Sequence, residues 1–142
     1  MPSIDKDLSL TERLEQFKIL YRYYSLEMQL IWLTDIIAMY CCEYLTSKGR
    51  ETKSSQSISV DLICIILKRD NLNYKYVKKL FAYRNAYVHK GPKYAISDFN
   101  VLRNEYMSEL SETASHFGLQ LNWNFVIYDN LANQAKTYIN MK

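Results

Sequence analysis

Glycine and proline are scarce in this chain, whose 142 residues contain 3 Gly and 2 Pro. Because these residues supply tight turns and interrupt helices, their scarcity predicts few turns and long helices. Cysteine and histidine are also few, with 3 Cys and 2 His. Cys41 and Cys42 are adjacent and Cys64 stands alone, which is no metal-binding spacing. We therefore expect buried, reduced thiols, no metal and no cofactor.

The sequence also lacks the signs of a membrane protein. Its first twenty residues are charged, which argues against a signal peptide. The most apolar stretch, residues 30–42, is shorter than a membrane span and contains Asp35. We expect a cytoplasmic protein without a membrane partner, in which this stretch forms a buried helix.

The composition is that of a globular protein. Hydrophobic residues make up 49% of the chain, enough to bury one core at this length. The sequence predicts a single domain over residues 1–142. Its polar stretches, residues 1–8 and 47–56, are expected to be flexible.

Helix signals dominate the first half of the chain. Ser9 and Glu12 have the spacing of a capping box, which marks a helix start. Apolar residues then recur every three or four positions as far as Met39, so one long helix, or two joined by a short break, should form here. A further helix is expected over residues 57–69, although its β-branched residues also allow a strand.

The second half continues the same pattern. Residues 73–89 have helical periodicity and end before the Gly-Pro pair at 91–92. Another helix is expected over 97–117. Residues 119–127 alternate as in a strand, but the spacing from Trp123 onward also fits a helix, and we predict a final helix from about Trp123. The expected fold is all-α, an antiparallel bundle of four to five helices with a long N-terminal helix.

Positive charge is concentrated between residues 68 and 93. This segment has eight cationic residues and one acid, a local net charge of +7 within a chain of net charge +3. Cations interleaved with aromatic residues are typical of a polyanion-binding face, although a solvated helix face gives the same pattern. The candidate RNA-binding residues of this segment are Lys75, Lys78, Lys79, Tyr83, Tyr87, Lys90 and Lys93.

The end of the 73–89 helix combines three chemically active side chains. Its predicted inner stripe consists of Val77, Leu80, Phe81, Arg84 and Val88. Arg84 thus occupies an apolar position and requires an anionic partner, for which Asp35 is a candidate. Asn85 and His89 are one turn apart and lie beside it. Either these residues form a structural ion pair with a histidine at the helix end, or they form a phosphate-cleaving site.

The order Arg84-Asn85, three further residues and His89 near a helix end resembles the HEPN family (higher eukaryotes and prokaryotes nucleotide-binding). The family signature is Arg, four to six residues and His, usually with a polar residue after the Arg. The resemblance implies a helical bundle and a metal-independent ribonuclease of toxin or antiviral type. Other members are inactive binding domains, which leaves a non-catalytic module as the alternative. A subgroup with Tyr two residues after the His is not matched, since Gly91 stands there.

The chemistry expected of such a site is attack by the 2′-hydroxyl of RNA on the adjacent phosphate. His89 would act as acid or base, Arg84 would stabilise the developing charge, and Asn85 would orient His89 or bind a phosphate oxygen. One histidine does not serve both proton transfers easily. A homodimer with two facing motifs would solve this, as in HEPN nucleases. An antitoxin or regulatory protein is a possible further partner.

Overall fold

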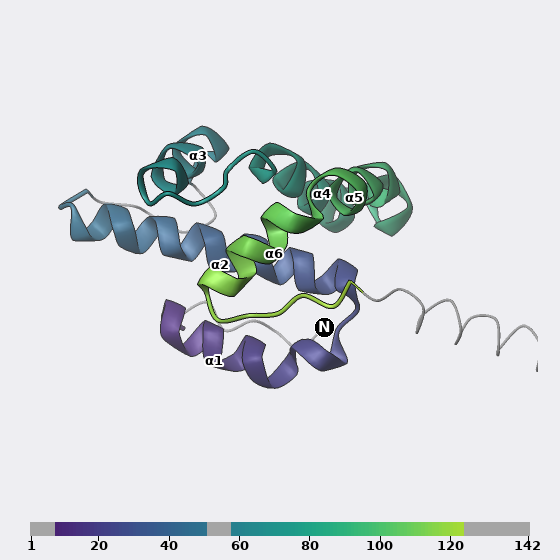
Figure 1. The fold of residues 1–142 in the computed structure, drawn as a ribbon, viewed down its shortest axis with the longest axis horizontal. Helices are drawn as coiled ribbons and strands as arrows, with labels where there is room; N and C mark the ends of the chain where they lie inside the picture. Colours follow the sequence, from purple (N-terminus) through teal and green to yellow (C-terminus); the bar gives the residue numbers. More distant parts are fainter. Residues whose placement is uncertain (1–7, 51–57, 124–142) are drawn as a thin grey trace, which may run out of the picture.

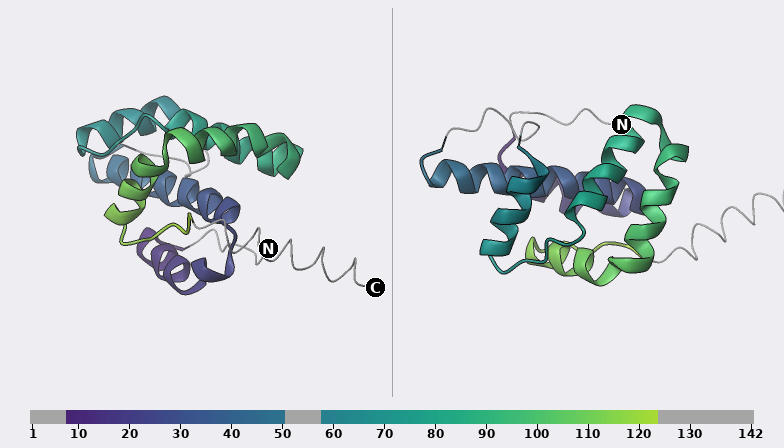
Figure 2. Two further views of the ribbon diagram at one scale, coloured as in Figure 1. Left: turned by 45° about the vertical axis from the view of Figure 1, so that its right-hand side comes forward. Right: turned by 90° about the horizontal axis from the view of Figure 1, so that it is seen from above.

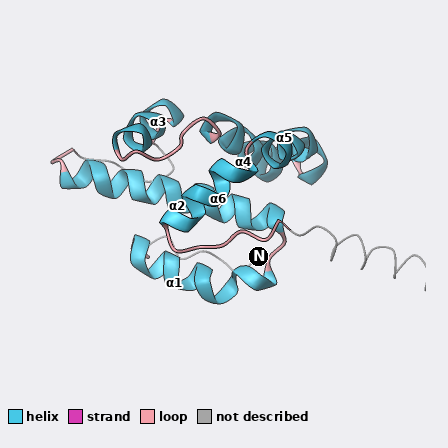
Figure 3. Ribbon diagram, viewed as in Figure 1, coloured by secondary structure: helices cyan, strands magenta, loops and turns pink. Residues whose placement is uncertain are grey.

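The computed structural model describes residues 8–50 and 58–123, and all regular structure in these ranges is helical (Figure 1, Figure 3). The elements are α1 (Leu10–Leu20), the 3-10 turn η1 (Tyr21–Tyr23), α2 (Leu26–Ser47), α3 (Val60–Arg69), α4 (Val77–Lys90), α5 (Pro92–Glu105) and α6 (Met107–His116). The expected all-α class is confirmed. The described residues contain six α-helices rather than four to five. The N-terminal stretch forms two helices, one of its two predicted alternatives, and the helix predicted over 97–117 is broken.

The first break separates α1 from α2. Ser9 caps α1 as predicted, since its hydroxyl accepts from the Glu12 amide at 3.2 Å. Ser25 caps α2 in the same way, accepting from the Met28 amide at 3.3 Å. Between the helices, the buried Gln29 amide donates to the carbonyl oxygens of Tyr21 and Tyr24. These hydrogen bonds satisfy two carbonyl oxygens at the turn between the helices, and α2 then runs alongside α1 (Figure 1).

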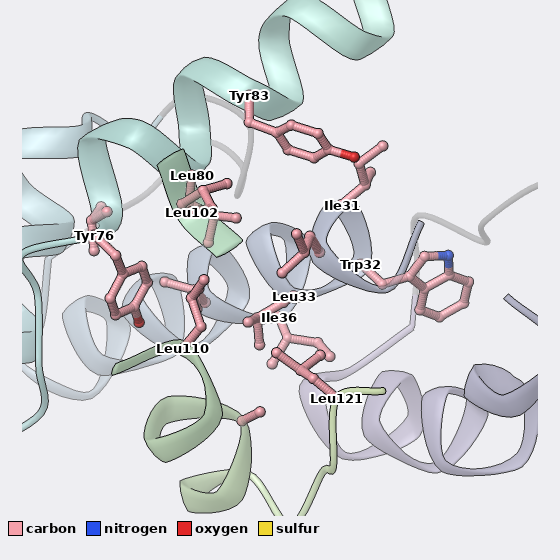
Figure 4. Close-up of a cluster of buried hydrophobic side chains, with 14 of the residues drawn as sticks. Ile31, Trp32, Leu33, Ile36, Tyr76, Leu80, Tyr83, Leu102, Leu110 and Leu121 are labelled. Atoms are coloured by element: carbon pink, nitrogen blue, oxygen red, sulfur yellow. The ribbon is translucent and has the colours of Figure 1, made fainter. Parts of the chain in front are cut away.

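Helix α2 is the centre of the bundle, with α1 on one side and the α4–α5 hairpin on the other (Figure 1, Figure 2). Figure 4 shows the core that gathers around it, with Leu33 and Ile36 facing side chains from α4, α5 and α6. Two tyrosines are buried here because their hydroxyls find partners. Tyr76 donates to Thr113 Oγ1 at 2.7 Å, and Tyr83 donates to the Glu27 carbonyl oxygen at 3.0 Å.

Helix α3 excludes the alternative of a strand for this segment. Its inner face consists of Ile63, Ile66 and Leu67, whereas Val60 and Cys64 are only half-buried. Among the cysteines, all of which are free, Cys41 is buried and the other two are half-buried. Burial raises the pKa of the Cys41 thiol to about 12, which keeps this group protonated.

The Gly-Pro pair ends α4 as expected, but it also starts the next helix. Gly91 has φ +113, a conformation that side-chain-bearing residues rarely adopt, and Pro92 is the first residue of α5. The predicted helix over 97–117 is therefore longer at its start. It is also broken at Tyr106, which redirects α6 so that Thr113 reaches Tyr76, the residue before α4.

The segment after α6 runs extended between α6 and α1 (Figure 1). Gly118 ends α6 with φ +73, and Leu119 and Leu121 are then buried while Gln120 and Asn122 are exposed. The alternation read from the sequence thus corresponds to an extended segment that packs on helices without joining a sheet. The Asn122 amide N–H donates to the Gln29 side-chain oxygen at 3.0 Å. The final helix predicted from about residue 123 lies outside the described residues, as do most of the two segments expected to be flexible.

Candidate functional site

The motif residues open on a cleft of about 520 Å³ between α2, the start of α3 and α4. Helix α4 contributes the three predicted catalytic residues, and α2 contributes a carboxylate. The lining residues are Thr34, Asp35, Ala38, Ile58, Val60, Phe81, Arg84, Asn85 and His89. A permanent cation, an amide, an imidazole and a carboxylate therefore share one cavity, which is a typical arrangement for binding a small polar group.

Arg84 is half-buried at the wall of this cleft, and Asn85 and His89 are exposed at its rim. The Arg84 guanidinium donates to the Asn85 side-chain oxygen through Nη1 at 3.2 Å. The structure therefore gives Asn85 a contact with Arg84, in addition to the two roles expected from the sequence, which were to orient His89 or to bind a phosphate oxygen. His89 lies in the last turn of α4, where unpaired helix carbonyls favour positive charge.

The anionic partner of this site is shared between two cations. Asp35 forms an ion pair with Arg13 of α1, with Oδ2 and Nη1 3.4 Å apart. The expected direct pair with Arg84 is therefore replaced by one with Arg13, but Arg84 is still close enough to act on the carboxylate. Arg13 is buried, 3% exposed, with its guanidinium carbon 5.7 Å from the centroid of the Trp32 ring. Asp35 thus links a buried cation to the cation of the cleft.

Burial raises the pKa of the Asp35 carboxyl above its ordinary value of 3.8, and the charges of Arg13 and Arg84 oppose the rise. The folded chain therefore binds a proton at Asp35 at pH values where the unfolded chain has released it. In that window, which begins near 3.8, the contribution of Asp35 to the free energy of unfolding decreases as pH increases.

We expect the stability of the wild type relative to Asp35→Asn to fall with increasing pH above 3.8 and then to level off, because asparagine does not titrate. Urea unfolding of both proteins across this pH range measures the difference. Glu15→Gln removes an exposed carboxylate and is the control, unfolded in parallel at each pH. A wild-type advantage that grows with pH would show that the Asp35 pKa is depressed instead.

The other candidate RNA-binding residues lie on α4 and beside it. Lys75, Lys78, Lys90 and Lys93 are exposed. Lys78 pairs with Asp61 on α3 at 3.7 Å, and Lys79 pairs with Asp98 on α5 at 3.2 Å. These two ion pairs neutralise part of the local charge of +7.

The two tyrosines proposed for RNA binding lie away from the motif cleft. Tyr83 is 1% exposed and belongs to the core, so its ring is not a surface for stacking in this structure. Tyr87 and Lys93 line a separate, mainly apolar groove of about 450 Å³ between α2, α4 and α5. The inner stripe of α4 is thus centred on Val77, Leu80 and Tyr83, while Val88, expected inside, is 50% exposed.

This rotation of α4 has a physical cause that the sequence pattern did not reveal. A buried tyrosine hydroxyl keeps a hydrogen bond when a backbone carbonyl accepts its proton. The Glu27 carbonyl oxygen accepts this hydrogen bond from Tyr83. Turning Tyr83 inward moves Arg84 to the edge of the buried face and places Phe81 in the cleft. The sequence did not predict that Arg13 pairs with Asp35 or that Phe81 lines the cleft, because no local signal distinguishes these residues from others on their helices.

No protein-family model, curated protein or solved structure matches this chain. Within residues 8–50 and 58–123, no group of three or more His, Cys, Asp and Glu side chains is placed to hold a metal ion. No helix in the same ranges is long and apolar enough to cross a membrane.

Proposed function

We propose that this protein is a metal-independent endoribonuclease of toxin or host-defence type, acting at the cleft formed by α2, α3 and α4. The observation that carries the proposal is that Arg84, Asn85 and His89 line one cavity together with a carboxylate. The resemblance of the sequence motif to that of HEPN nucleases supports the same activity. The proposal rests on the motif and on the geometry of the cleft.

The chemistry follows from what each side chain can do at a phosphodiester. A base removes the proton of the RNA 2′-hydroxyl, whose oxygen attacks the neighbouring phosphorus. The bond from phosphorus to the 5′-oxygen breaks, and an acid gives that oxygen a proton. His89 carries out one of the two proton transfers. The products are a 2′,3′-cyclic phosphate and a 5′-hydroxyl end.

Arg84 stabilises the additional negative charge of the pentacoordinate phosphorus through its planar guanidinium. Its bond to Asn85 and the field of Asp35 fix the direction of this guanidinium before substrate binds. Such preorganisation lowers the barrier because little rearrangement is required during the reaction.

The second proton transfer requires another group. In the proposed homodimer, the His89 of a second copy performs it, and the two motifs face each other across one phosphate. The exposure of His89 at the cleft rim supports this arrangement, because a facing copy can reach it. A toxic nuclease also requires a neutralising partner, so an antitoxin or regulatory protein belongs to this proposal.

A non-catalytic binding module is the second candidate. It is favoured by the observation that Arg84 already has the Asn85 oxygen and the Asp35 charge as partners. A guanidinium held in this way also serves a structural role or binds an RNA phosphate without cleaving it. This candidate predicts binding of RNA, a nucleotide or a protein partner by the wild type with no product formed.

The test is cleavage of an end-labelled single-stranded RNA in EDTA by the purified wild type and by Arg84→Ala/His89→Ala. We expect cleavage only by the wild type, with 2′,3′-cyclic or 3′-phosphate ends, and resistance at any position with a 2′-deoxy sugar. Cleavage of the deoxy position, or equal activity of the double variant, would contradict the proposal. Expression of the wild type should also slow the growth of the host, and His89→Ala should relieve this.

A further inference from the structure

The motif cleft continues along α4 into a second cavity of about 350 Å³ between α3 and α4. Three residues line both cavities, namely Val60, Phe81 and Asn85. Beyond them the second cavity is lined by Ser59 and Asp61 at the start of α3 and by Lys78 and Ala82 on α4. The two cavities thus form one groove, with Arg84 and His89 at one end and Lys78 at the other.

Phe81 lies where the two cavities meet. It precedes Arg84 by three residues and Asn85 by four, so the three side chains share one face of α4, about one turn apart. Its side chain is half-buried and packs partly against the core. It is the aromatic residue that lines both cavities among the described residues.

The surroundings of Phe81 leave room for a planar group. Ala82, its neighbour on α4, is small and exposed and lines the same cavity. Lys78 at the far end is paired with Asp61, but both side chains are largely exposed and 3.7 Å apart. An exposed ion pair of this kind contributes little to stability. The Lys78 ammonium can therefore exchange the Asp61 carboxylate for a phosphate.

We propose that Phe81 is the stacking platform of a nucleotide subsite next to the scissile phosphate. The base of the adjacent nucleotide stacks on Phe81, and Lys78 binds the phosphate that follows it. This inference rests on the proposed nuclease function and names the substrate class of the same groove. A base that stacks on a protein side chain has left its helix, so the substrate is single-stranded RNA.

The test separates this subsite from catalysis by measuring binding in the His89→Ala background. Fluorescence anisotropy of a labelled single-stranded RNA gives the dissociation constant in EDTA. Base–aromatic stacking is worth about 1–3 kcal/mol, so Phe81→Leu should weaken binding by roughly 5- to 150-fold while keeping most of the side-chain volume. Phe81→Trp should retain the affinity, and its fluorescence should be quenched by the bound RNA.

Tyr23→Leu is the matched control, because it removes an exposed aromatic ring that lines neither cavity. It should leave the affinity for RNA unchanged, and thermal melting should show that each variant is folded. Equal affinities for the parent and Phe81→Leu, or equal binding of duplex and single-stranded RNA, would overturn the subsite. Phe81-dependent binding by a wild type that does not cleave RNA would refute the nuclease proposal and leave the subsite standing.

Discussion

Replacing His89 with alanine should lower the rate of RNA cleavage by about 10²- to 10⁴-fold, the usual contribution of a positioned acid or base. His89 is exposed at the cleft rim, so its removal should leave the fold intact. The effect should appear in kcat, because the imidazole acts on the reaction and not mainly on binding.

The chain provides a matched control for this experiment, because it contains one other histidine. His116 is at the end of α6, against the rings of Tyr40 and Phe117, and does not line the cleft. His116→Gln should cleave RNA at the wild-type rate. Equal loss of activity in both variants would show that the histidines act through stability and would contradict a catalytic role for His89.

Arg84→Ala should reduce cleavage by about 10²- to 10³-fold, as expected for loss of one group that stabilises transition-state charge. Arg84→Lys should recover part of this loss, because lysine keeps the charge but not the planar pair of donors. Since Arg84 and His89 act on the same phosphate, the double variant should lose much less than the product of the single effects.

The second large effect concerns stability. Arg13→Ala should lower the free energy of unfolding by about 3 kcal/mol, at the lower end of the range for breaking a buried ion pair. The lower end applies because the Asp35 side chain remains 32% exposed, while that of Arg13 is 3% exposed. The variant also loses the contact of the guanidinium with Trp32. Without Arg13, the pKa of Asp35 should rise further, since Arg13 is one of the two charges that lower it.

Chemical denaturation of Arg13→Ala beside Arg22→Ala measures this difference. Arg22 is an exposed arginine of the adjacent turn η1, so its removal should change stability by no more than about 0.5 kcal/mol. Arg13→Leu/Asp35→Leu should recover much of the loss, because no uncompensated charge then remains in the bundle. An Arg13→Ala variant as stable as Arg22→Ala would contradict a buried ion pair at this position.

Much of the fold was predictable because helix boundaries depend on residues within one turn of each other. Ser9 and Glu12 predicted the start of α1, and the Gly-Pro pair at 91–92 predicted the end of α4. The break between α1 and α2 remained one of two alternatives, because the capping by Ser25 competes with an uninterrupted apolar stripe. The Tyr106 break was missed, since it depends on how α6 packs and has no Gly, Pro or side-chain cap.

The candidate site was predictable in part for the same reason. Arg84, Asn85 and His89 are neighbours on one helix, so their proximity follows from helical geometry alone. The partner of Asp35 and the position of Phe81 depend on how three helices rotate relative to one another. Nothing in the sequence near these residues specifies that rotation.

The sequence by itself thus determined the helices, most of their ends and the motif on α4, because these depend on contacts between residues up to about four positions apart. Only the tertiary structure decided that Tyr83 turns inward, that Arg13 pairs with Asp35, and that Phe81 and Arg84 line an open cleft. These three features depend on side chains from distant segments, which compete for the same buried volume and for the same hydrogen-bond partners.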